Sequence, residues 1–199
     1  LTVSGSWSDR YGGYSCTTYF QLTDFNPFES IPGVSLRYVQ HPSDLKQPDV
    51  IFLPGTKNTM DDLKWLRESG MEALILKAAA SGTLIFGICG GYQMLGENLS
   101  DPHGVEAGGT IRGIGLLPVD TVFAEHKTRT QVCGKFLELD EEFAPLKNVE
   151  FTGYEIHMGE STWKNGAVAS TSTCDTVTGT EKTEGTLSQC MRNLCSWHF

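Results

Sequence analysis

The chain has 199 residues, of which 39% are hydrophobic, and it carries a formal net charge of −9. This length suits one α/β domain with a substantial buried core, whereas the acidic balance argues against a nucleic-acid surface. No stretch reaches the roughly 20 apolar residues of a membrane-spanning helix, and the first residues lack the basic-then-apolar pattern of a signal peptide.

The first recognisable elements are a strand, a turn and a second strand. Residues 1–21 have no clear period, residues 34–39 are β-prone, and residues 42–48 suit a loop or one helical turn. The continuous apolar run DVIFL, residues 49–53, is typical of a strand buried on both faces. It ends at PGTKNT, residues 54–59, whose glycine and small polar residues can turn backbone N–H groups toward an anion. We therefore expect a buried strand that runs into an anion-binding loop.

Two helices and another strand are expected next. Thr59 is followed by acidic residues, which favours a helix start, and apolar residues continue at helical spacing with a break near Gly70. Residues 83–88 then form a short apolar, β-rich run. Strand, loop, helix and strand in this order predict a right-handed crossover and a parallel sheet with helices on its faces. Further along, residues 167–184 suggest a β-hairpin or a loop at the domain edge.

The segment TLIFGICGGYQMLG, residues 83–96, predicts a strand, a tight turn and a helix with Cys89 at the apex. Such a turn points a side chain out of the sheet, while the backbone N–H groups that follow face the group it attacks. Because the loop 54–59 also follows a strand, both features should meet at the carboxyl edge of the sheet. This convergence favours a catalytic Cys89 over a buried, inert thiol.

The other five cysteines show no CxxC pairing, so the sequence predicts neither a metal site nor a disulfide framework. A reducing, cytoplasmic location is therefore expected. Cys133, in an apolar and glycine-containing context, suits a buried structural thiol.

Five segments together resemble the glutamine amidotransferase domain of the cobyric acid synthase family, in the cobalamin branch of the triad (class I) amidotransferases. They are GVSLRYV (33–39), LPGTKNTMDDLKWL (53–66), GICGGYQMLG (87–96), GIGLLPVDTVF (113–123) and GYEIHMGE (153–160). The resemblance implies an α/β, flavodoxin-like three-layer sandwich with a mostly parallel central sheet. It divides the chain into a divergent N-terminal segment, an amidotransferase domain and a divergent C-terminal segment, at residues 1–22, 23–189 and 190–199.

The resemblance also implies a reaction, in which Cys89 attacks the side-chain amide of glutamine, forms a thioester and releases ammonia. The residues expected around the oxyanion and the substrate are Gly55, Thr56, Gly90, Gly91, Tyr92 and Gln93. In the family, an N-terminal ATP-dependent ligase domain uses the ammonia to amidate corrin carboxylates of cobyrinic acid a,c-diamide. No phosphate-binding loop motif occurs here, so we expect that domain to be absent, with no cofactor in this domain and ATP and Mg in the ligase domain.

The base that takes the thiol proton has two candidates in the sequence. His157 is one because a carboxylate two residues away shares its strand face, although a structural or corrin-side contact is the simpler interpretation. His198 follows Cys89 by 109 positions, near where the family places its histidine, but its neighbours do not match the family motif of Tyr, any residue, His, Gly, any residue, Phe. The remaining histidines, His41, His103 and His126, suit the surface. The alternative is therefore a catalytically impaired relic that keeps the fold.

Both ends of the chain can be explained by a shift of reading frame. If Leu194 is encoded by TTA or CTA and Ser196 by TCA, reading one base later can give Tyr, Val, His, Gly, Ile and Phe. A displaced N-terminus would remove the first strand of the sheet and leave an unpaired apolar edge near residues 50–53. The coding DNA tests this hypothesis.

Overall fold

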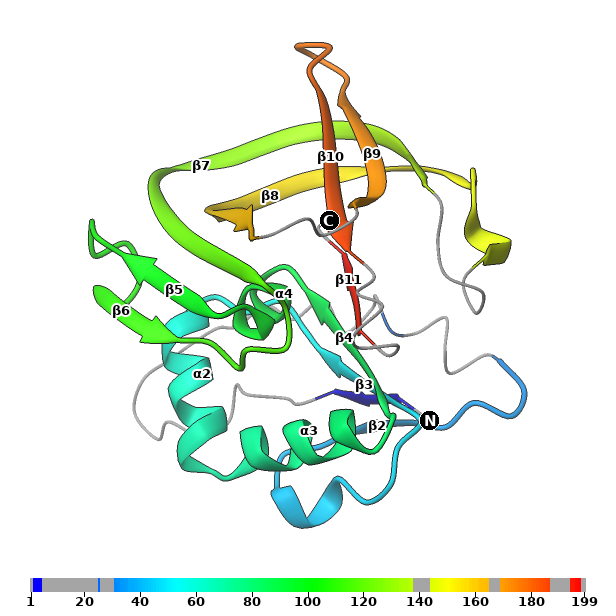
Figure 1. Cartoon of the computed structure of the whole chain (residues 1–199), viewed down its shortest axis with the longest axis vertical. Coiled ribbons are helices and arrows are strands. Elements are labelled where there is room, and N and C mark those ends of the chain that lie inside the picture. The colour runs from blue at the N-terminus through cyan, green and yellow to red at the C-terminus, as the bar shows by residue number, and fades with distance from the viewer. Residues whose placement is uncertain are drawn as a thin grey trace.

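The computed structural model describes residues 2–4, 25, 31–137, 144–164, 169–186 and 194–197, which form two sheets and three α-helices (Figure 1). In chain order the strands and α-helices are β1 (Thr2–Ser4), β2 (Leu36–Tyr38), β3 (Val50–Leu53), α2 (Thr59–Glu68), α3 (Met71–Ala80), β4 (Leu84–Ile88), α4 (Gly90–Leu95), β5 (Asn98–Asp101), β6 (Gly109–Arg112), β7 (Val119–Phe136), β8 (Glu150–Trp163), β9 (Ala169–Asp175), β10 (Glu181–Thr186) and β11 (Leu194–Trp197). Two 3₁₀ turns, η2 (Pro42–Asp44) and η3 (Ala144–Leu146), complete the set.

The first sheet has the strand order β11-β4-β3-β1-β2, and every pairing in it is parallel. The parallel sheet and the strands expected near residues 34–39, 49–53 and 83–88 are confirmed. The expectation of an unpaired edge beside residues 50–53 is wrong, because Thr2 and Val3 of β1 pair with Val50 and Ile51 of β3. Strand pairing uses backbone N–H and C=O groups, which a divergent sequence still supplies.

The two predicted helices are confirmed as α2 and α3. The N-cap is Asn58, whose side chain accepts a hydrogen bond from the backbone N–H of Asp61 at 3.1 Å, so Thr59 is already the first helical residue. The break between the helices falls at Gly70, where φ is 80°. This left-handed conformation suits glycine, and it lets the chain turn sharply into α3.

The second sheet was not predicted from the sequence, apart from the hairpin at residues 167–184. Its strand order is β10-β9-β7-β5-β6, and β8 pairs with β7 off this path. The hairpin is confirmed as the antiparallel pair β9 and β10. In Figure 1, the long strands β7 and β8 arch over the first sheet, and the hairpin stands beside them.

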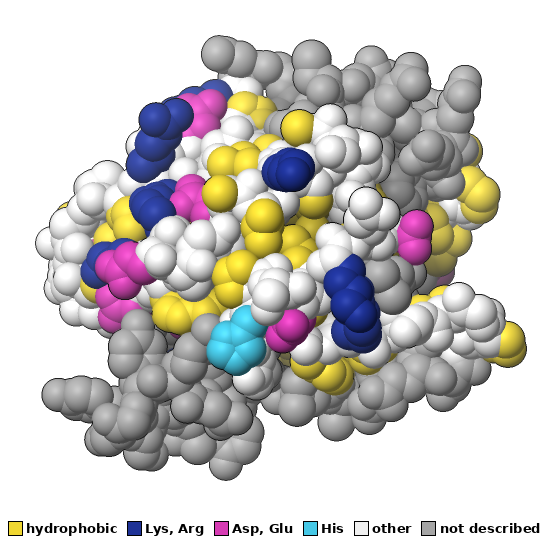
Figure 2. Space-filling model, turned by 90° about the horizontal axis from the view of Figure 1, so that it is seen from below, with side chains coloured by type: hydrophobic (Ala, Val, Ile, Leu, Met, Phe, Trp, Pro, Cys, Tyr) yellow, Lys and Arg dark blue, Asp and Glu magenta, His cyan; other side chains and the backbone are white. Residues whose placement is uncertain are grey.

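One hydrophobic core connects the two sheets. Side chains with 0% exposure come from α2, β4, α4, β5 and β7, and they are Leu63, Leu66, Ile85, Leu95, Leu99 and Val119. The short helix α4 contributes Tyr92, Met94 and Leu95 to this core, so it is held firmly between the sheets. The face that carries α3 shows hydrophobic side chains among charged ones (Figure 2). Leu76 of α3, 37% exposed, belongs to the exposed hydrophobic residues.

Candidate active site at the end of the parallel sheet

Cys89 occupies the turn between β4 and α4, as the sequence predicts. Its backbone angles are φ 51° and ψ −112°, and it is one of three described non-glycine residues with positive φ. The thiol is partly exposed, and its sulfur lies 3.9 Å from the carbonyl oxygen of Ile156 in β8. The sulfur is therefore held at a strained bend rather than enclosed in the core.

The loop after β3 lies against this bend. Leu53 of β3 pairs with Gly87 of β4, so both strands end at the same edge. A Cβ added at Gly55 would lie 3.4 Å from Cβ of Cys89. A Cβ at Gly90 would lie 3.1 Å from the backbone nitrogen of Thr56. The predicted convergence of Cys89 with the loop 54–59 is confirmed.

Gly91 allows the start of α4 to approach the end of β3 closely. A Cβ added at this position would fall 2.0 Å from the carbonyl oxygen of Leu53 and 2.8 Å from that of Pro54. These neighbours are backbone atoms, which no rotamer change can move away. Gly91 is thus required for the packing that brings the loop beside Cys89.

Tyr92 and Gln93 point away from solvent. Each is 2% exposed, and the Tyr92 ring packs against Trp163 with centroids 6.0 Å apart. The hydroxyl oxygen of Thr59 lies 3.5 Å from Oε1 of Gln93. A Cβ at Gly159 of β8 would lie 2.5 Å from Nε2 of Gln93, so this amide fills the space between α2 and β8. Contacts of Tyr92 and Gln93 with a substrate stay predictions.

His157 and Glu155 form a hydrogen-bonded pair on β8, the strand whose Ile156 carbonyl lies near the cysteine. Nε2 of His157 lies 2.6 Å from Oε1 of Glu155, and their side chains are only 11% and 6% exposed. The shared strand face predicted for them is confirmed. Ile156, between them in β8, is the residue whose carbonyl lies near the sulfur of Cys89. The imidazole and its carboxylate therefore stand on the strand that covers Cys89.

The other histidines separate as expected where the structure describes them. The side chains of His41 and His103 are exposed, and Nδ1 of His103 lies 3.4 Å from Glu125. The side chain of His126 and the whole of His198 lie outside the described residues. Residues 138–142, an acidic run, lie outside them too.

Sequence reasoning missed Glu106, which braces the loop side of the site. Its carboxylate accepts from the hydroxyl of Thr59 at 3.1 Å and from the backbone N–H of Met60 at 3.0 Å. Burial raises its pKa. The carboxylate of Asp101, 1% exposed, holds the loop that carries Glu106 by accepting three backbone N–H groups, those of Val105, Glu106 and Gly108. The local pattern around Glu106 is that of an ordinary turn, so no sequence signal marked this contact.

Asp62, an acidic side chain on α2, has a raised pKa. Burial, with repulsion from the Glu106 and Asp61 carboxylates, raises the pKa of Asp62 to about 7. The first turn of α2 thus binds the Glu106 carboxylate through the backbone N–H of Met60. In the same turn, Asp62 is largely protonated below neutral pH.

Two exposed residues, Arg129 and Cys133, belong to β7. Arg129 is exposed in β7 directly opposite Ile156 of β8. Cys133 is exposed, so the expectation of a buried thiol is wrong; it lies on the solvent face of β7, and its neighbouring valine points into the core instead. Within the described residues, no three side chains of the His, Cys, Asp and Glu types are grouped to hold a metal. No described helix has the length and apolar character to span a membrane.

Comparison with solved structures identifies the fold. The chain superimposes on the structure of PurLQS from Thermotoga maritima with a TM-score of 0.68 at 20% identity, covering 97% of this chain and 83% of that one. A glutamine amidotransferase from Thermotoga maritima gives a TM-score of 0.55 at 12% identity, covering 98% of this chain and 72% of that one. The predicted class I glutamine amidotransferase-like fold is confirmed.

Sequence comparison finds closer relatives. Residues 15–197 match the CobB/CobQ-like glutamine amidotransferase domain. The cobyric acid synthase of Lachnoclostridium phytofermentans is 59% identical over 143 residues, which make up 72% of this chain and 28% of the relative. That of Ruminiclostridium cellulolyticum is 50% identical over 166 residues, 82% of this chain and 32% of the relative. The chain thus spans about a third or less of these relatives.

Proposed function

Because the chain belongs to the CobB/CobQ-like glutamine amidotransferase domain family, we propose that it hydrolyses glutamine at Cys89 and supplies ammonia to an ATP-dependent ligase domain. The observation that carries the proposal is the partly exposed bend at Cys89, with the loop after β3 on one side and β8 on the other. A nucleophile at such a bend, with backbone donors nearby, suits acyl transfer.

The proposed reaction has two halves. The Cys89 thiolate attacks the side-chain carbonyl carbon of glutamine, and the resulting oxyanion is stabilised by backbone N–H groups of the loop containing Gly55 and Thr56 and of the turn at Gly90 and Gly91. Collapse of this intermediate breaks the C–N bond and forms a thioester, while a protonated base donates its proton to the departing ammonia. Water then attacks the thioester, giving glutamate and the free thiol.

The base is assigned to one of two histidines, His157 or His198. His157 is supported by its hydrogen bond to Glu155, since a carboxylate partner orients the imidazole. His198 is supported by the position of the histidine in the family motif. In either case we expect that loss of the base lowers the glutaminase rate by about two to four orders of magnitude.

The activity of the complete protein is also a proposal, because the chain spans about a third or less of its relatives. The relatives are named cobyric acid synthases. We therefore propose that the ammonia is used to amidate corrin carboxylates of cobyrinic acid a,c-diamide in the cytoplasm. ATP and Mg would bind to the ligase domain. The amidotransferase domain, residues 23–189, would need no cofactor of its own.

A glutaminase assay tests the proposal. We expect the chain to release glutamate from glutamine, and we expect Cys89→Ala to reduce the rate to background. His157→Ala and His198→Ala, each with a pH profile, identify the base. His103→Ala is the matched control, because this exposed imidazole also pairs with a glutamate but stands on a different part of the surface. Equal rates for the chain and Cys89→Ala would remove the enzymatic assignment for this chain.

A second measurement separates a working enzyme from an impaired relic. A glutamine analogue with a chloromethyl ketone should alkylate Cys89, and excess glutamine should protect it. If labelling and protection occur without glutamate release, the alternative of a non-catalytic domain that retains its glutamine pocket is favoured. If glutamine gives no protection, the pocket assignment itself is wrong.

A further inference from the structure

Two cysteines far from the active-site bend lie directly opposite each other on neighbouring strands. In the antiparallel pairing of β7 with β9, Cys133 and Cys174 are Cα partners. Residues opposed in this way point their side chains to the same face of the sheet, with Cα atoms about 4.5–5.5 Å apart. This is within the range that a disulfide spans without backbone movement.

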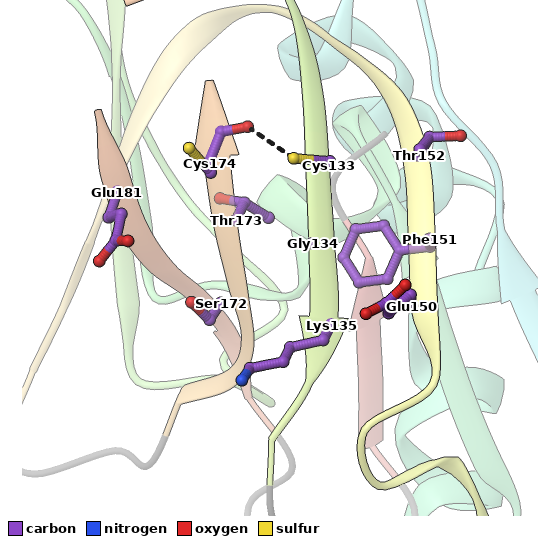
Figure 3. Close-up of a pocket in the computed structure, with 10 residues that line it drawn as sticks. All are labelled: Cys133, Gly134, Lys135, Glu150, Phe151, Thr152, Ser172, Thr173, Cys174 and Glu181. Atoms are coloured by element: carbon purple, nitrogen blue, oxygen red, sulfur yellow. Dashed lines mark hydrogen bonds between the residues drawn. The ribbon is translucent and has the colours of Figure 1, made fainter. Parts of the chain in front are cut away.

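The Cys133 side chain reaches the backbone of Cys174, and both cysteines are free thiols. The thiol of Cys133 is directed at the carbonyl oxygen of Cys174, with sulfur and oxygen 3.7 Å apart (Figure 3). Rotation about the Cα–Cβ bonds is the only change needed to bring the sulfurs together, because the register already fixes the backbone.

The pair is also accessible to a small molecule. Cys133 is exposed and Cys174 is partly exposed. Both line an open hollow of about 450 Å³ on the second sheet, whose polar lining includes Lys135, Ser172 and Glu181 (Figure 3). A hollow of this size admits a drug-sized small molecule.

We propose that Cys133 and Cys174 form a redox-active dithiol that is closed to a cross-strand disulfide by a small-molecule disulfide. This site is separate from Cys89 and does not depend on the glutaminase assignment. The sequence separation of 41 residues means that closure ties the β9–β10 hairpin covalently to β7.

The chemistry proceeds by two exchanges. The Cys133 thiolate attacks one sulfur of the small-molecule disulfide, which forms a mixed disulfide and expels one thiolate. Cys174 then loses its proton and attacks the Cys133 sulfur, which forms the protein disulfide and expels the second thiolate. The two protons lost by the cysteines are taken up by the two released thiolates, so the protein is oxidised by two electrons and the reagent is reduced to two thiols.

The roles of the two cysteines follow from their surroundings. Cys133 is the more exposed thiol, so it meets the reagent first. Burial, with the charge of Cys133, raises the pKa of Cys174, which agrees with the later step for this residue. Cys133 is therefore the attacking thiol and Cys174 the resolving one.

Peptide mapping after oxidation tests the proposal. The full chain is incubated with oxidised glutathione, its remaining thiols are alkylated, and it is digested after lysine and arginine. Cys133 then falls in the peptide 130–135 and Cys174 in the peptide 165–182, each with no other cysteine. We expect these two peptides to be recovered linked, lighter by two hydrogen atoms than their sum, and separate again after reduction.

Three variants sharpen the result. Cys174→Ser should leave Cys133 as a stable mixed disulfide with glutathione, whereas Cys89→Ala should leave the linkage unchanged. The variant Cys174→Ser with Thr173→Cys is the matched control, because residue 173 faces the opposite side of β9 and should give no link. Recovery of both peptides unlinked from the oxidised chain, whether alkylated or each bound to glutathione, would overturn the proposal.

Discussion

Replacing Cys89 by glycine should stabilise the fold while abolishing its proposed chemistry. At φ 51° and ψ −112°, the Cβ of Cys89 is held in a conformation that costs a non-glycine residue about 1–3 kcal/mol. Alanine at this position keeps the Cβ and loses only the sulfur, whereas glycine removes both. The difference in stability between the two variants therefore isolates the backbone strain.

The size of this difference follows from two opposing effects. Relief of strain gives about 1–3 kcal/mol, and the greater freedom of glycine in the unfolded chain takes back about 0.5–1 kcal/mol. Cys89→Gly should thus be more stable than Cys89→Ala by about 0.5–2 kcal/mol. For a chain of this length, each kcal/mol corresponds to a change in Tm of about 2–4 °C.

Thermal and urea unfolding of both variants measure the difference, with Ala73 as the reference position. Ala73 is exposed on α3, so Ala73→Gly should destabilise by about 0.5–1 kcal/mol, the opposite sign. If Cys89→Gly proves less stable than Cys89→Ala, the bend is not strained, and the argument from its backbone angles fails.

Three further perturbations test the surroundings of the bend. Gly91→Ala and Gly113→Ala each place a Cβ 2.0 Å from a backbone carbonyl oxygen, so each should lower the free energy of unfolding by at least about 1–3 kcal/mol. Only Gly91→Ala, beside Cys89, should also lower the glutaminase activity of the protein that stays folded. Equal activity in the two variants would contradict this expectation. Asn58→Ala removes the N-cap of α2 and should lower the free energy of unfolding, measured in urea, by about 1 kcal/mol, while Asn58→Asp should lower it far less. Equal losses of stability in the two variants would mean that the cap is unimportant. Because the pKa of Asp62 is raised from 3.8 to about 7, the folded state keeps this proton longer than the unfolded state, so its contribution to stability falls as pH rises from about 4 to about 7. Asp62→Asn should flatten unfolding free energy over that range and stabilise the fold at pH 8 by about 2–4 kcal/mol, and an unchanged pH dependence would show that Asp62 titrates normally.

The elements around Cys89 could be predicted because their signals are local. The apolar run before Pro54, the glycines around Cys89 and the break at Gly70 each reflect the conformations allowed to a few neighbouring residues. The structure confirms the strand, loop and turn that these residues form. Their meeting at one edge also follows from the sequence, because parallel strands joined by a right-handed crossover end on the same side.

The second sheet could not be predicted in the same way. One face of the long strands β7 and β8 is partly exposed to solvent, so these strands carry mixed polar and apolar residues. Such strands give a weak periodic signal in the sequence. The exposed position of Cys133 has the same cause, because a one-residue change of register moves a side chain to the other face.

The sequence by itself predicted the bend at Cys89 and the loop beside it, because each is encoded by residues within one strand and its following turn, and it predicted the fold class from the order of these elements. Only the tertiary structure decided which residues, distant in the sequence, come into contact. The contacts of Cys89 with Ile156, of Thr59 with Glu106 and of Cys133 with Cys174 join residues 67, 47 and 41 positions apart. Such pairs form when separate elements pack into one core and one sheet, and no pattern of neighbouring residues records that packing.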